Sequence, residues 1–139
     1  MGLFSGTRPD NLGVHDGRLA PPKPTPNCVS SQADKNADAG HYVEPLRYGG
    51  EANKAWEALR GIVSGMQRVD VVKSESNYLH AEFSSRLMGY VDDAEFYLDG
   101  ARGLIHVRSA SRLGRSDFGV NRERIEAIRA RLIERMGDK

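Results

Sequence analysis

The spacing of apolar residues changes between residues 66 and 69, and that change restricts the fold more than any other feature. Between residues 51 and 66 they recur every three or four positions, on one face of a helix: Ala52, Ala55, Trp56, Leu59, Ile62, Val63 and Met66. From residue 69 onward apolar and polar residues alternate, as in a strand with one buried face. The sequence therefore predicts an amphipathic helix followed by a sheet.

Four strands are predicted in succession after this helix, at residues 69–72, 78–83, 90–98 and 103–109. Turns rich in Ser, Asn, Asp and Gly separate them. A second helix is predicted to start near Asn121, whose side chain can cap free backbone N–H groups. Its inner stripe is Ile125, Ile128, Leu132 and Met136. The order α-β-β-β-β-α predicts an α+β fold, with a four-stranded antiparallel sheet and two helices on one face.

The hairpin formed by the last two strands has a predictable register. A turn centred on Gly100 and Ala101 would place Asp93 opposite Arg108 and would sort the apolar residues onto one face. The other face would be polar and aromatic, and would carry Tyr78, His80, Glu82, Asp93, Glu95, Tyr97, His106 and Arg108.

Residues 1–45 show no sustained hydrophobic period and are rich in Gly, Pro, Asn and Asp. Prolines at positions 21, 22, 24 and 26 favour an extended backbone. We expect this extended segment to lie as a strap across the domain formed by residues 46–139. Residues 27–32 form a small polar cluster that also contains Cys28 and Val29, two residue types that are usually buried. This favours a docked strap over a disordered tail, with contacts expected at Asn27, Cys28 and Ser30.

The charge composition limits the classes of function. The formal net charge is +1 at pH 7, which opposes nucleic-acid binding by bulk electrostatics. Arginines in the last helix are balanced by Glu123, Glu126 and Glu134, which also argues against a nucleic-acid partner. Of the 20 cationic residues 15 are Arg, a bias that suits two-point contacts with carboxylates and phosphates. A GC-rich genome would give the same bias.

Cysteine content and hydropathy indicate a compartment. Cys28 is the only cysteine, which excludes an internal disulfide and a multi-cysteine metal site. No apolar run approaches the roughly 20 residues of a membrane span, and no signal peptide is visible. We therefore expect a cytoplasmic protein with no membrane span and no bound cofactor; the sequence leaves its oligomeric state open.

Three motifs occur in order along the chain. They are PNCVSS at residues 26–31, GYVDDAEF at 89–96, and VRSASRLG at 107–114, which leads into DFGVNR at 117–122. Together they resemble the family called domain of unknown function 1499 (DUF1499), over about residues 22–132. The resemblance implies a bacterial origin, or one in a plastid-bearing eukaryote, and it implies no established activity. Many members resemble secreted or membrane-tethered proteins, whereas no leader is visible here.

The polar stretch 103–124 is the strongest candidate for a site. Guanidinium groups, hydroxyls and a helix N-terminus are the groups that bind anions. We interpret the chain as a non-enzymatic binding or accessory module that recognises a small anionic group or a protein partner's carboxylate. The residues expected to converge on this ligand are Arg108, Ser109, Ser111, Arg112, Arg115, Asn121 and Arg122.

A hydrolase is a second interpretation. Cys28 or a clustered serine would act as nucleophile, with His80 or His106 as base and Asp93 or Glu95 to orient it. The sequence has no nucleophile-elbow motif, and we predict no catalytic residue.

A metal site and a structural network are the remaining interpretations. A metal would require His80, His106, Glu82 and Glu95, but such ligand types are common on neighbouring strands and no metal is predicted. In the structural interpretation, the carboxylates Asp92, Asp93 and Glu95 pair with Arg108 and Arg112 and only hold the loop to the sheet. This last role is compatible with anion binding.

Overall fold

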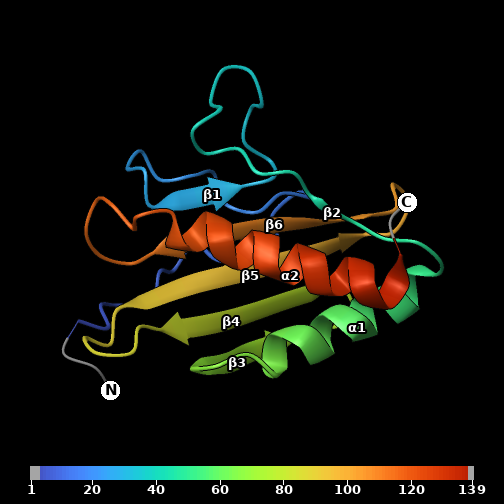
Figure 1. The fold of residues 1–139 in the computed structure, drawn as a ribbon. Coiled ribbons are helices and arrows are strands. Elements are labelled where there is room, and N and C mark those ends of the chain that lie inside the picture. The colour runs from blue at the N-terminus through green and yellow to red at the C-terminus, as the bar shows by residue number, and fades with distance from the viewer. Residues whose placement is uncertain (1–3, 138–139) are drawn as a thin grey trace.

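A computed structural model describes residues 4–137 as one antiparallel sheet with two helices (Figure 1). The elements are β1 (Cys28–Ser30), β2 (Leu46–Arg47), α1 (Ala52–Ser64), β3 (Val69–Ser74), β4 (Tyr78–Ser84), β5 (Val91–Asp99), β6 (Leu104–Ser111) and α2 (Val120–Met136). Neighbouring strands follow the order β1-β6-β5-β4-β3, and β2 also pairs with β6. The α+β class and the four consecutive strands β3 to β6 are as predicted. The prediction of four strands was too low, because β1 and β2 add to the edge at β6.

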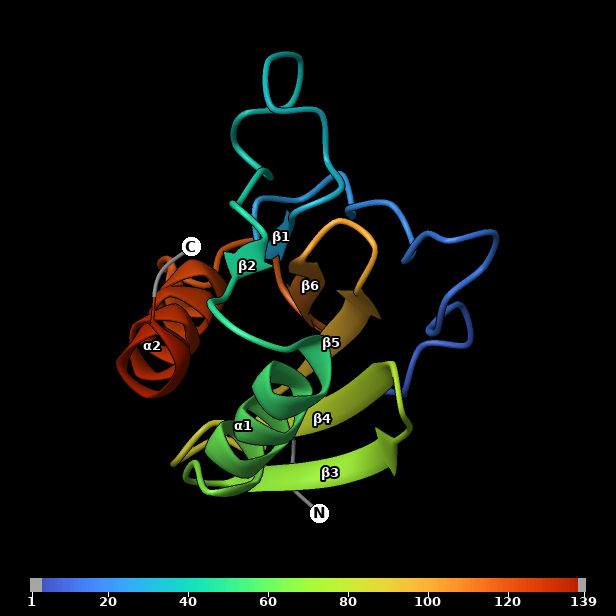
Figure 2. The same ribbon diagram turned by 90° about the vertical axis from the view of Figure 1, so that its right-hand side faces the viewer.

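The two helices lie on one side of the sheet and the N-terminal segment lies on the other (Figure 2). Alternating residues of the central strands face the helices, and these are the apolar ones that the pattern predicted. On α2 the inner residues Ile125, Ile128 and Leu132 are fully buried, and Met136 packs partly buried against the same core. Neither helix has the length and apolar character that crossing a membrane requires.

The register of the β5–β6 hairpin differs from the prediction by two residues. Asp93 lies opposite Ala110, and Arg108 lies opposite Glu95. The loop has four residues between Asp99 and Leu104 instead of two, and it closes with Gly103 at φ 69°. A shift of two residues leaves every side chain on its predicted face, so hydrophobic alternation alone cannot detect it.

The start of α2 also differs from the prediction. The helix begins at Val120, and the Asp117 carboxylate accepts hydrogen bonds from the backbone N–H groups of Gly119 (2.9 Å) and Asn121 (3.0 Å). Asp117 therefore supplies the capping oxygens that we expected from Asn121. The Asn121 side chain is instead fully buried against the sheet.

The N-terminal segment is docked on the sheet. Strand β1 pairs with β6, so that Cys28 lies opposite Ala110 and Ser30 opposite Arg108. Further upstream the backbone N–H of Gly13 donates to a carboxylate oxygen of Glu95 on the polar face of the sheet, at 2.7 Å. The strap thus covers this face and shares the sheet with the rest of the chain. The division of the chain at residue 45 stays a prediction.

Candidate functional site

Four ionisable side chains lie buried between the sheet and the strap. His80, Asp93, Glu95 and Arg108 have exposed fractions of 4%, 1%, 0% and 3%. They occupy alternate positions of β4, β5 and β6 and so point away from the helices. Buried charge is costly unless it is paired and hydrogen-bonded, so the arrangement of these groups determines whether the face is stable.

Asp93 lies at the centre of the first ion-pair cluster. Arg112 donates to both of its oxygens, with Nε 2.7 Å from Oδ2 and Nη2 2.9 Å from Oδ1. Nη2 of Arg112 also lies 2.6 Å from Oε2 of Glu82, and Nε2 of His80 lies 2.8 Å from Oδ1 of Asp93. Burial opposes ionisation of Asp93, but the hydrogen bonds from Arg112 and His80 outweigh it and lower the pKa of Asp93 below its ordinary value.

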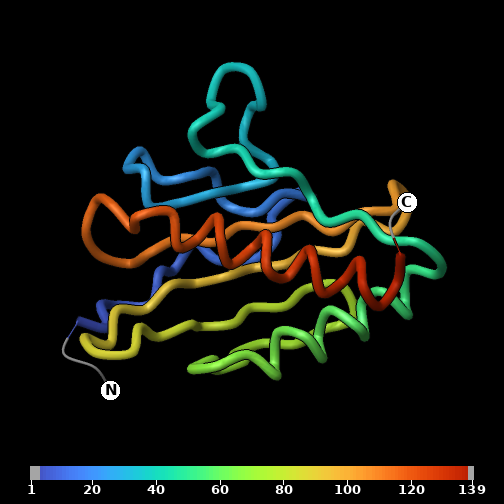
Figure 3. Tube along the Cα trace, viewed as in Figure 1, coloured from blue at the N-terminus to red at the C-terminus, as the bar shows by residue number. Residues whose placement is uncertain are grey.

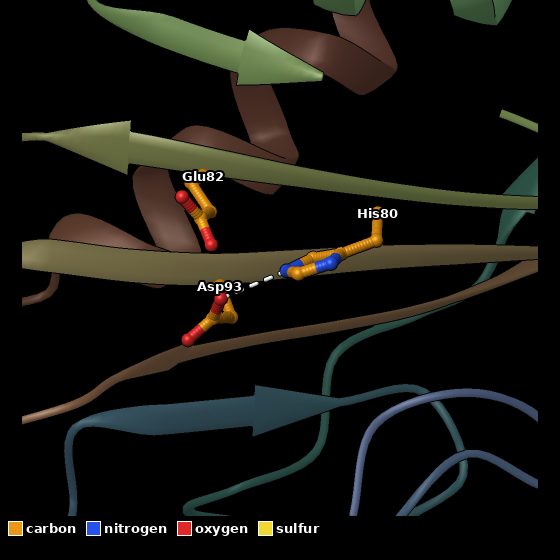
Figure 4. A group of neighbouring side chains, drawn as sticks. All are labelled: His80, Glu82 and Asp93. Carbon is orange, nitrogen blue, oxygen red and sulfur yellow. Dashed lines mark hydrogen bonds and ion pairs between the residues drawn. The ribbon is translucent and has the colours of Figure 1, made fainter. Parts of the chain in front are cut away.

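Three of these groups have the composition of a metal site. Figure 4 shows His80, Glu82 and Asp93 turned toward one another, and one ligand atom of each lies within 4.8 Å of the others. The metal interpretation of the sequence had combined two of them with His106 and Glu95, which lie outside this group. The Arg112 guanidinium already contacts both carboxylates, so it supplies the positive charge that a metal ion would bring.

Glu95 and Arg108 form the second cluster. Oε2 of Glu95 accepts hydrogen bonds from the Tyr78 hydroxyl (2.5 Å) and the Gly13 N–H (2.7 Å). Burial, together with the neighbouring Glu95 charge, raises the pKa of Tyr78. Nη1 of Arg108 lies 3.7 Å from Oε1 of Glu95, beyond hydrogen-bond distance, and its Nη2 donates to the Pro21 carbonyl at 3.2 Å. Among the described residues, Oε1 of Glu95 and Nε of Arg108 are buried without a hydrogen-bond partner.

A cavity of about 200 Å³ lies between the strap and these clusters. Its lining residues are Thr7, Pro9, Asn11, Lys23, Asp93, Arg108, Ala110, Ser111 and Arg112. Three of them are cations and one is a carboxylate. Lys23 enters from the strap, and its Nζ donates to the Ser111 carbonyl at 2.6 Å. Three of the seven predicted binding residues, Arg108, Ser111 and Arg112, thus line one cavity, although the Ser111 hydroxyl is bonded to Asn121.

Two further predicted binding residues, Ser109 and Asn121, lie on the helix side of the sheet. The Ser109 hydroxyl donates to Oδ1 of Asn121 at 2.6 Å. Nδ2 of Asn121 donates to the Ser111 hydroxyl (3.0 Å), the Asp117 carboxylate (2.8 Å) and the Asn27 carbonyl (3.2 Å). This side chain thus connects the strap, β6 and α2 within the protein, and its amide is fully engaged.

Arg115 and Arg122 point to other parts of the surface. Arg115 is exposed, and Arg122 donates to the Gly40 carbonyl at 3.2 Å. The expected convergence of all seven residues on one site is therefore not what the structure shows. Strand alternation is the reason, because it sends consecutive residues to opposite faces of the sheet. Ligand binding by any of the seven stays a prediction.

The sequence analysis missed Arg124. Asp92, expected to pair with Arg108 or Arg112, faces the helix side and pairs with Nη2 of Arg124 at 2.9 Å. The guanidinium carbon of Arg124 also lies 4.5 Å from the centre of the Phe83 ring. The sequence does contain a signal: positions 121, 124, 125 and 128 share one helical face, so Arg124 borders the buried stripe.

Of the groups proposed for a hydrolase, His80 and Asp93 do meet, at 2.8 Å, but Cys28 is not suited to act as the nucleophile. Cys28 is fully buried, and burial raises the pKa of its thiol. Both features oppose a nucleophilic role.

A serine and a histidine that the sequence analysis did not combine come closer. The Ser31 hydroxyl lies 3.3 Å from Nδ1 of His106, but it already accepts the Val107 N–H at 2.9 Å. Asp99 lies 3.8 Å from Nε2 of His106, too far for the hydrogen bond that would orient a catalytic base.

Fold and site together define a class of α+β domain: an antiparallel sheet with helices on one face and strap-covered ion pairs on the other. The chain belongs to the family described as protein of unknown function (DUF1499), whose sequence model matches residues 18–132. The matched region includes the strap from Arg18 onward as well as most of α2. Comparison with the curated proteins gave no match, and comparison with the solved structures gave none either.

Proposed function

We propose that this chain is a binding module and that the cavity under the strap holds a small anionic group, a carboxylate or a phosphate. One observation carries the proposal: the buried guanidinium of Arg108 lines the cavity, and its Nε has no acceptor among residues 4–137. An unsatisfied buried donor of this kind costs about 1–3 kcal/mol, and an oxyanion in the cavity would remove that cost.

The charges around the cavity support an anion. Arg112 is neutralised by Asp93, and Arg108 by Glu95, although at the long distance of 3.7 Å. In the described part of the chain the Lys23 ammonium donates a hydrogen bond only to the Ser111 carbonyl and forms no ion pair, so its charge is not balanced within the cavity. Cations with incomplete pairing favour a negatively charged ligand. A volume of about 200 Å³ suits a small group and excludes a large ligand.

Thermal unfolding of the full chain with phosphate, sulfate and acetate tests the proposal. A ligand at 100 times its Kd stabilises a protein by about 2.7 kcal/mol, or roughly 8–10 °C in Tm for a chain of this size. Lys23→Met should abolish this shift. Lys54→Met, on the exposed face of α1, is the matched control and should retain it. If none of the three anions raises Tm while Lys23→Met leaves the fold intact, the proposal is wrong.

A structural role is the second candidate, because each buried carboxylate of this face already has a cationic or hydrogen-bonding partner. Glu95 binds the strap through Gly13, and Glu82 binds it through Arg8. In this alternative the network only fixes the strap to the sheet, and the variants above would change stability without changing any response to anions.

Under either candidate function, we propose that the protein is located in the cytoplasm of a bacterium, a compartment that keeps its single thiol reduced.

A further inference from the structure

Exposed apolar side chains gather at one end of the molecule. Of the eight large exposed apolar residues in the described chain, six lie there: Leu87, Met88, Tyr90, Leu113, Phe118 and Val120. They belong to the β4–β5 loop and to the β6–α2 segment, whose traces lie at the same end in Figure 3. Both segments border one cleft of about 440 Å³. We call residues 85–90 and 112–120 the loop end.

Two side chains of the loop end stand almost entirely in solvent. Leu87 is 89% exposed and Phe118 is 91% exposed, each on a separate loop. Phe118 also has φ 53°, a conformation that non-glycine residues rarely adopt. Leaving two such side chains in water has no benefit for folding, so they point to contact with something outside the chain.

The loop end is also basic. Of its three arginines, Arg112 has a side chain that is only 7% exposed and is paired with Asp93 and Glu82, which leaves Arg86 and Arg115 as the outward cations. Arg86 and Arg115 are exposed, and within residues 4–137 no carboxylate lies within ion-pair distance of either. The single acidic residue, Asp117, turns inward to the first turn of α2. Outward charge at this end is therefore positive.

The shape of the loop end distinguishes a lipid surface from a peptide ligand. Phe118 lines the cleft together with the Asp92–Arg124 ion pair, whereas Leu87 lies outside it, and both apolar side chains are about nine-tenths exposed (Leu87 89%, Phe118 91%). A peptide confined to the cleft would not cover Leu87. A membrane surface instead receives projecting apolar side chains, and arginines beside them contact lipid phosphates.

We propose that the loop end attaches the protein peripherally to a membrane surface rich in anionic lipid, with Leu87 and Phe118 entering the interface and Arg86 and Arg115 contacting headgroups. This proposal is independent of the anion-binding cavity, because none of these four side chains lines it. Each arginine near an anionic surface should strengthen binding about fivefold at low salt.

Fluorescence provides a direct test. The only tryptophan, Trp56, is 2% exposed, so it gives a nearly constant background. In a Phe118→Trp variant of the full chain, vesicles of equal parts phosphatidylcholine and phosphatidylserine should shift the emission to shorter wavelength. Vesicles of phosphatidylcholine alone should cause a much smaller shift. The absence of a shift with both kinds of vesicle would overturn the proposal.

Co-sedimentation with the same vesicles separates insertion from simple charge attraction. The double variant Leu87→Ser/Phe118→Ser should bind the vesicles at least tenfold more weakly. The double variant Arg86→Gln/Arg115→Gln should bind them about 25-fold more weakly.

The control is Val71→Ser combined with Val72→Ser, which removes two exposed apolar side chains from β3 and should leave binding unchanged. If the Leu87/Phe118 variant binds vesicles as tightly as the original chain, the insertion mechanism is wrong. Capture of a protein partner through these residues, without vesicle binding, would also contradict it.

Discussion

Arg112 binds Asp93 through two nitrogen atoms, at 2.7 and 2.9 Å, and so joins β5 to the first residue after β6. Asp93 is 1% exposed, and the guanidinium that neutralises it belongs to a residue whose backbone N–H also donates to the Val91 carbonyl of β5, at 3.1 Å. The buried charge pair therefore adds to backbone contacts in holding the start of the loop that leads to α2, and it closes one wall of the cavity under the strap.

Removing one member of this pair should destabilise the fold strongly. We expect Arg112→Gln to lower the free energy of unfolding by about 3–5 kcal/mol, because it removes the guanidinium from a buried carboxylate and leaves Asp93 only its contact with His80. Asp93→Asn should cost a similar amount, and the double variant should cost clearly less than the two single losses combined. Urea unfolding measures all three. Arg60→Gln, which breaks an exposed pair with Glu57, is the control and should cost no more than about 1 kcal/mol.

Stability should depend on pH through Asp93. Burial opposes its ionisation, but hydrogen bonds from Arg112 and His80 lower its pKa below the ordinary 3.8. Between the two pKa values the unfolded chain binds more protons than the folded one. The stabilisation is therefore complete above the ordinary value and is lost as the pH falls below about 4. Urea unfolding between pH 6 and pH 2 should show a shallower loss in Asp93→Asn than in the original chain. Equal slopes would show that Asp93 is not the group responsible.

Asn121 should be essential for stability although it is not a helix cap. Asn121→Ala would leave the Ser109 hydroxyl and the Asn27 carbonyl with fewer partners in a buried site, so we expect a loss of about 2–4 kcal/mol. Thermal or urea unfolding measures it, with Asn36→Ala on the exposed part of the strap as control. A loss as small as that of the control would mean that the Asn121 contacts make no net contribution to the free energy of unfolding.

Periodicity in the sequence predicts the helices, the strands β3 to β6 and the two faces of the sheet. An element that is buried on one side has apolar residues at regular intervals along the sequence, so its spacing can be read directly. Periodicity does not predict the pairing of Glu95 with Arg108. That pairing depends on the length of the loop at Gly103, and a loop two residues longer produces the same alternation. Strands β1 and β2 are too short, at three and two residues, to show a period at all.

Sequence proximity also misled the prediction of the site. The residues from Arg108 to Arg112 look like one polar cluster, but Arg108 and Arg112 face the strap whereas the Ser109 side chain faces α2. The missing component on the strap side is Lys23, nearly 90 residues away in the chain and brought to Ser111 by strap docking. No local pattern encodes a contact at that separation.

Cys28 should be unreactive while the chain is folded. Its side chain is fully buried, and burial raises the pKa of the thiol, so that little thiolate forms at neutral pH and a reagent cannot reach it. We expect alkylation by iodoacetamide to proceed much more slowly than for a free thiol and to accelerate in urea, in parallel with unfolding. Arg112→Gln, which weakens the fold, should also accelerate it, whereas Arg60→Gln should not. Alkylation of the folded chain at the rate of a free cysteine would show that the strap opens readily and that Cys28 is accessible to a substrate.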